Sequence, residues 1–80
     1  MTITQATAAR ILELCKEREI TINKISILSG VTQSTVNDIV NGKTQNPGIG
    51  TIKKLCDGIE ISIQDFFRSE LFSDLEQELR

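Results

Sequence analysis

The 80-residue sequence contains no histidine, tryptophan or tyrosine, and it has only two cysteines and one proline. Two cysteines without histidine cannot complete a tetrahedral zinc site within one chain. The commonest general base of enzymes is also missing, and no nucleophile has an evident base beside it. A chain this short has little room for a buried pocket. We therefore expect no enzyme activity, metal, cofactor or small-molecule ligand.

Long hydrophobic runs are absent as well. The longest contain only a few residues, far below the ~20 that a membrane helix needs. The N-terminal stretch MTITQATAAR lacks the basic and then apolar regions of a signal peptide. These absences predict a cytoplasmic protein with no membrane partner. In a reducing compartment, Cys15 and Cys56 are expected to be small core residues rather than a disulfide.

The net charge of −2 is distributed unevenly. Residues 1–54 hold seven basic and four acidic side chains, whereas residues 55–80 hold two basic and seven acidic ones. An acidic protein can still bind DNA when its positive charges gather on one face. The acidic C-terminal segment should then point away from the phosphates.

Apolar residues recur at three- and four-residue steps, and no strand pattern is present. This periodicity predicts an all-α fold of five helices with a short C-terminal helix, and no internal repeat is apparent. The expected helices cover about 5–18, 22–28, 33–41, 51–57 and 62–67, with a last segment over about 70–79.

Small polar residues and glycines mark the expected helix ends. The N-cap candidates are Thr2 or Thr4, Thr21, Thr32 and Ser62. Gly30 should end the second helix in the left-handed conformation that glycine favours, and Gly58 should end the fourth. Within the second helix, Ile25 and Leu28 are expected to face the core.

The third helix has one apolar side and one side of hydrogen-bonding groups, yet it contains neither Arg nor Lys. The apolar residues are Val36, Ile39 and Val40, and the polar ones are Gln33, Ser34, Asn37, Asp38 and Asn41. A purely structural surface would favour stronger helix formers such as Glu, Lys, Arg or Ala. Two short helices joined by a glycine turn have the layout of a helix-turn-helix.

The stretch from Thr21 to Phe67 resembles the Cro and phage-repressor type of helix-turn-helix (the XRE family, with a lambda-repressor-like fold). The matching residues are Thr21, Ser26, Gly30-Val31-Thr32, Val36, Ile39, Asn41-Gly42-Lys43, Asn46-Pro47, Thr51-Ile52 and the Ile61-to-Phe67 ending. The chain departs from the family at Ser26, where Ala is common, and at Ile22, where many members have Gln. Because Ile22 cannot donate a side-chain hydrogen bond, the backbone N–H groups at the start of this helix are left to bind a phosphate.

The resemblance implies a five-helix bundle, spanning residues 1–67, that binds double-stranded DNA with helix 33–41 in the major groove. It implies a transcriptional regulator, expected to repress as a homodimer on a palindromic operator. Amide side chains suit the edge of adenine, and acceptors suit cytosine N4. The expected base-reading residues are Gln33, Ser34, Asn37 and Asp38.

Phosphate contacts are expected from residues around this helix, because positioning charge can come from outside it. The candidates are Thr21, Asn23, Lys24, Thr32, Thr35, Asn41, Lys43, Thr44, Gln45 and Arg10. For Arg10 an ion pair that holds the first helix is an equally good interpretation.

The tail over residues 68–80 leaves two interpretations open. Leu71, Leu75 and Leu79 repeat every four residues beside Phe72. This stripe can pack on its own domain or on a second copy, and we favour dimerisation because a C2 dimer matches a palindromic operator. The acidic tail also motivates an alternative function, a protein-interaction module such as an antitoxin or anti-regulator.

Overall fold

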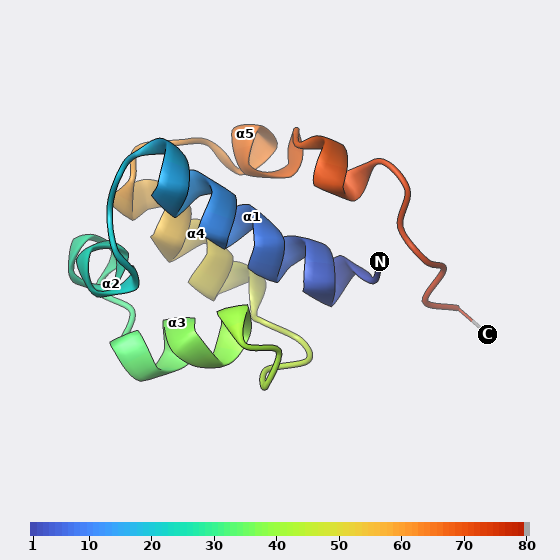
Figure 1. The fold of residues 1–80 in the computed structure, drawn as a ribbon, viewed down its shortest axis with the longest axis horizontal. Coiled ribbons are helices and arrows are strands. Elements are labelled where there is room, and N and C mark those ends of the chain that lie inside the picture. The colour runs from blue at the N-terminus through green and yellow to red at the C-terminus, as the bar shows by residue number, and fades with distance from the viewer. Residues whose placement is uncertain (80) are drawn as a thin grey trace.

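The computed structural model describes residues 1–79, and all regular structure within them is helical. The elements are α1 (Ile3–Glu17), α2 (Ile22–Ser29), α3 (Gln33–Val40), α4 (Ile49–Gly58), α5 (Ile63–Phe67) and a 3₁₀ turn, η1 (Glu70–Phe72). Figure 1 shows α1 and α4 crossing the middle of the molecule, with α3 and α5 on opposite sides of them. The predicted all-α, five-helix fold is confirmed. None of the helices in the described residues is long and apolar enough to span a membrane.

Side-chain caps determine where the helices begin. The hydroxyl of Thr2 accepts the N–H of Gln5 at 3.1 Å, and the Gln5 side chain accepts the N–H of Thr2 at 2.9 Å. The predicted caps Thr21, Thr32 and Ser62 each accept an N–H three residues on, at 3.0, 3.2 and 3.0 Å respectively. These bonds satisfy N–H groups that have no partner inside the helix.

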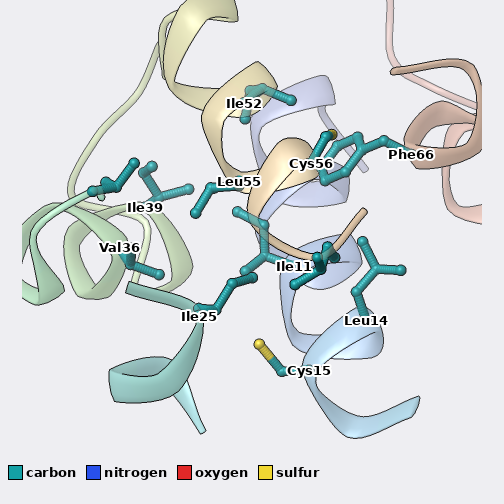
Figure 2. Packing of buried hydrophobic residues seen from close by; sticks show 12 residues of the cluster. Ile11, Leu14, Cys15, Ile25, Val36, Ile39, Ile52, Leu55, Cys56 and Phe66 are labelled. Atoms are coloured by element: carbon teal, nitrogen blue, oxygen red, sulfur yellow. The ribbon is translucent and has the colours of Figure 1, made fainter. Parts of the chain in front are cut away.

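The core is built from the apolar sides of all five helices. Figure 2 shows Ile11, Ile25, Val36 and Leu55, from α1 to α4, pointing toward one another. The buried cluster is Ile11, Leu14, Cys15, Ile25, Val31, Val36, Ile39, Ile52, Leu55, Cys56, Ile59 and Phe66. Burial raises the pKa of both cysteine thiols above the ordinary range, so they stay protonated and unreactive. The prediction that both are core residues is confirmed.

Two corners of the fold have the same construction, one between α1 and α2 and the other between α4 and α5. Their sequences, LCKEREITI over 14–22 and LCDGIEISI over 55–63, share Leu-Cys, Glu-Ile and a final Ile. The glutamates have φ angles of 54° at Glu19 and 61° at Glu60. In both corners the following isoleucine N–H returns to the cysteine carbonyl at 3.0 Å. The chain therefore contains an internal repeat that we had not expected, and it turns after α4 at Glu60 rather than at Gly58.

Gly58 is the last residue of α4, as predicted, and it lies where α4 meets the end of α2. A Cβ atom at Gly58 would lie 2.8 Å from the backbone N and Cα of Ser29 and 2.9 Å from the carbonyl carbon of Leu28. The backbone of α2 therefore rests directly against α4. Because backbone rather than side chain fills this contact, Leu28 is 45% exposed, and the prediction that it faces the core is wrong.

The C-terminal segment is not the continuous helix predicted over residues 70–79. Only η1 is helical, and residues 73–79 have no regular structure. A helix would place the carboxylates of Glu70, Asp74 and Glu78 four residues apart, where like charges repel. Short isolated helices are also marginal in water. The stripe of Leu71, Leu75 and Leu79 therefore does not form.

The beginning of the tail packs on its own domain. The Phe72 ring lies 4.9 Å from the Phe67 ring and 6.1 Å from the Phe66 ring, measured between centroids. Further along, the N–H of Glu76 donates to the carbonyl of Met1 at 3.0 Å. The tail thus runs back beside the N-terminus. The predicted division between residues 1–67 and 68–80 stays a prediction, and residue 80 lies outside the described residues.

Gly58→Ala should lower the free energy of unfolding by about 1–3 kcal/mol, because the added methyl group forces the backbones of α2 and α4 apart. Gly50→Ala is the matched control, since it lies in the same helix and a Cβ there meets nothing within 4 Å. Alanine at Gly50 should leave stability unchanged or raise it by about 0.5–1 kcal/mol. Urea denaturation measures both. Equal effects of the two substitutions would contradict a close α2–α4 contact.

Candidate nucleic-acid interface

The turn between α2 and α3 is held by short-range hydrogen bonds. Gly30 has a φ of 73°, and its N–H donates to the carbonyl of Ser26 at 3.0 Å. The Ser26 hydroxyl donates to the carbonyl of Val31, whose side chain is buried. A small residue at position 26 therefore ties α2 to the turn that leads into α3. The predicted role of Gly30 as a left-handed helix end is confirmed.

The structure separates the two sides of α3 as the sequence predicts. Val36 and Ile39 are 0% and 1% exposed and fix the helix to the core. Val40 is half-buried. On the outer side, Gln33, Ser34 and Thr35 are exposed, whereas Asn37 and Asp38 are half-buried. The exposed first turn of α3 thus presents amide and hydroxyl groups to solvent.

A hydrogen bond joins the outer sides of α2 and α3. The Asn23 Nδ2 group donates to Gln33 Oε1 at 2.8 Å. It holds the Gln33 side chain with its oxygen toward α2, so the Gln33 NH₂ group remains available as a donor. Sequence reasoning named both residues but missed their contact. Residues ten positions apart on different helices give no periodic signal.

The loop after α3 is fastened to the last turn of that helix. The backbone N–H groups of Lys43 and Thr44 donate to the carbonyl of Asp38 at 2.8 and 3.1 Å. The Gln45 side chain donates to the carbonyl of Gly42 at 2.8 Å, so its amide group is engaged inside the loop. Lys43 is exposed and Thr44 is half-buried. These bonds place Lys43 beside the C-terminal end of α3.

Two lysines bracket the polar side of α3. Lys24 lies in the first turn of α2 and Lys43 follows α3, and neither forms an ion pair within residues 1–79. Lys53 and Arg68, by contrast, are paired with Asp57 and Asp65. The hydrogen bonds between Asn23 and Gln33 and between Thr32 and Thr35 bring these residues together at the first turn of α3. Thr21 and Lys24 lie with Asn23 at the start of α2.

Arg10 is not part of this surface. Its Nε donates to the carbonyl of Phe66 at 2.7 Å, and its Nη2 donates to the carbonyl of Asp65 at 2.7 Å. The remaining nitrogen pairs with Glu13. With only 12% of the side chain exposed, Arg10 joins α1 to α5. Of the two interpretations of Arg10, the structure therefore supports the ion pair that holds the first helix, and we do not include Arg10 in the proposed interface.

Residues 10–70 match the family of Cro/C1-type HTH DNA-binding domains. Two relatives come from Bacillus subtilis (strain 168). The uncharacterized HTH-type transcriptional regulator RghRB is 34% identical over 53 residues, which are 66% of this chain and 38% of that protein. The HTH-type transcriptional repressor RghR is 40% identical over 48 residues, or 60% and 36% of the two chains. The chain thus spans well under half the length of these relatives.

Two solved structures have the same fold. The prophage Lp1 protein 11 superposes with a TM-score of 0.80 at 33% identity and covers 94% of this chain and 99% of its own. An HTH_3 family transcriptional regulator from Vibrio cholerae gives 0.78 at 26% identity, covering 85% and 38%. Because the family match includes the whole α2–turn–α3 unit, the chain belongs to the family of Cro/C1-type HTH DNA-binding domains.

Proposed function

We propose that the chain represses transcription as a homodimer that reads a palindromic operator with α3 in the major groove. The observation that carries this proposal is the exposed first turn of α3, where Asn23 orients the amide of Gln33. In docked helix-turn-helix proteins the N-terminal residues of the recognition helix meet the base edges. The name of the relative RghR, a transcriptional repressor, supports the assignment of repression. Occupancy of an operator would block access to the promoter.

Base reading falls to Gln33, Ser34, Asn37 and Asp38. The free NH₂ group of Gln33 can donate to a purine N7, while its oxygen has a second lone pair for adenine N6. Asn37 lies one turn further along the same side, where it can read the next bases. Asp38 is half-buried and can accept from cytosine N4.

Phosphate contacts come from the ends of the helices. The α2 N-terminus offers its first-turn N–H groups, with Thr21, Asn23 and Lys24 around it. Lys43 supplies charge at the other end of α3, with Asn41 and Thr44 nearby. Thr32 and Thr35, whose hydroxyls lie 2.8 Å apart, flank the first turn. Gln45 contributes through its backbone, because its side chain is engaged in the loop.

A protein-interaction module is the second candidate function. The exposed acidic side chains of Glu70, Asp74, Glu76 and Glu78 favour it, since they offer a surface for a basic partner. In that case α3 would not select bases. The two functions are therefore separated by substitutions on α3 and beside it.

Gln33→Ala should weaken binding to the preferred duplex by about 1–3 kcal/mol and relax selection at one base pair. Asn23→Ala should relax selection at the same base pair, because it releases the Gln33 amide. Gln64→Ala is the control, since Gln64 is an exposed glutamine on α5, across the molecule from α3. Fluorescence anisotropy on the preferred duplex and its single-base variants measures these effects. Full affinity and selectivity in both α3-side variants would rule out base reading by Gln33.

Lys43→Ala should weaken binding to all duplexes alike and lower the slope of log affinity against log salt by about one, because one phosphate contact is lost. Lys54→Ala, which removes an exposed lysine from α4, should leave the slope unchanged. Titrations at several salt concentrations give both slopes. A normal slope for Lys43→Ala would place the loop after α3 away from the phosphates.

A further inference from the structure

Two segments that lie side by side contain no charged side chains. Residues 1–9 and 44–52 contain no Asp, Glu, Lys or Arg, although 25% of the whole chain is charged. A hydrogen bond from the Thr4 hydroxyl to the Gln45 carbonyl joins the two segments. We call the surface formed by these two segments the neutral face. It combines the N-terminal part of α1 with the loop that leads into α4.

The neutral face exposes large apolar side chains. Met1 is 49% exposed, Ile3 37% and Ile49 69%. Ile3 and Ile49 line one open hollow together with Pro47 and Phe67. Each isoleucine is the first residue of its helix. An acidic residue at such a helix start would stabilise the helix. An exposed isoleucine gives no such stabilisation, but it stabilises an interface when a partner buries it.

The location of the neutral face suits a dimer on DNA. Figure 1 shows the N-terminus and the loop after α3 on the side of the molecule away from α2, with the C-terminal tail beyond the N-terminus. A contact on this side leaves the polar side of α3 free. It also brings the C-terminal ends of two α3 helices toward each other across a two-fold axis. Paired half-sites one helical turn apart require two α3 helices related by a two-fold axis.

We propose that the neutral face is the homodimer interface, with a second copy of this chain as its occupant; this inference rests on the proposed function. A C2 contact sets each patch against itself, so any charge in it meets the same charge. The neutral face avoids this repulsion. At its rim the Met1 ammonium group lies 3.8 Å from the carboxylate of Glu76, so these two opposite charges offset each other.

The tail is a poorer candidate for the same contact. Two tails facing each other would oppose the carboxylates of Glu70, Asp74 and Glu78. Phe72, one of the residues predicted to dimerise, packs instead against Phe66 and Phe67 of its own domain. The interface is therefore assigned to the helix starts at Ile3 and Ile49 rather than to Leu71, Phe72, Leu75 and Leu79.

Two matched substitutions in the full chain test the interface. Ile49→Glu places a carboxylate in the neutral face, and Ile27→Glu places one at an equally exposed position on α2, since the two isoleucines are 69% and 68% exposed. Sedimentation velocity should show the dimer dissociation constant of Ile49→Glu raised by about tenfold or more, because a C2 interface receives two buried carboxylates. Ile27→Glu should stay within about twofold of wild type.

The Ile49→Glu variant should fold normally, because glutamate is favourable at the first position of a helix. A thermal melt of the variant checks that its stability is unchanged. Ile3→Glu, at the start of α1, is a second variant with the same expected outcome. An unchanged dimer in both variants, a dimer weakened by Ile27→Glu alone, or a monomeric wild type overturns the proposal. Binding to a single half-site duplex should be unaffected by Ile49→Glu. A protein that dimerises through the neutral face but selects no DNA would instead contradict the proposed function alone.

Discussion

The position of α3 depends on the contact between the backbones of α2 and α4. Ser29 lies so close to Gly58 that no side chain fits between them. The same residues lead directly into Gly30 and Val31, where the chain turns into α3. Val31, Val36 and Ile39 then join α3 to the core. These contacts therefore hold the exposed turn of α3 in a fixed position. A surface that binds in a DNA groove needs such rigid support.

A helix without Arg or Lys can read DNA when other residues supply the charge. In this structure Lys24 and Lys43 lie at the two ends of the α2–α3 unit, and the amides and hydroxyls lie between them. Hydrogen bonds to base edges carry sequence information, whereas phosphate contacts carry affinity and position. Arg10, the most obvious cation near the N-terminus, is used to join α1 to α5. The modest positive charge favours the proposed dimer, because a second copy doubles the phosphate contacts.

Helix caps and turns, which depend on bonds within a few residues, were predicted correctly from the sequence. Contacts between distant segments were not. The caps at Thr21, Thr32 and Ser62 and the left-handed Gly30 involve bonds within a few residues, so sequence reasoning predicted them. The exposure of Leu28 and the role of Gly58 depend on how α2 meets α4. The link between Asn23 and Gln33 has the same origin.

The tail shows a different limit of periodicity. Leucines every four residues favour a helix, but carboxylates at the same spacing oppose it. At the two corners, Glu19 and Glu60 have positive φ angles, a conformation in which glycine is usually found. The sequence therefore did not indicate that the chain turns at these residues.

Selection of bound duplexes from a random DNA pool, at low and then at physiological salt, tests the central claim most directly. If α3 reads bases as a dimer, the selected duplexes will contain an inverted repeat with half-sites about 10 base pairs apart. The enrichment will persist at the higher salt, because base-edge hydrogen bonds do not depend on released counterions. Folded protein that enriches no sequence at either salt concentration would contradict the account and leave α3 without a base-reading role.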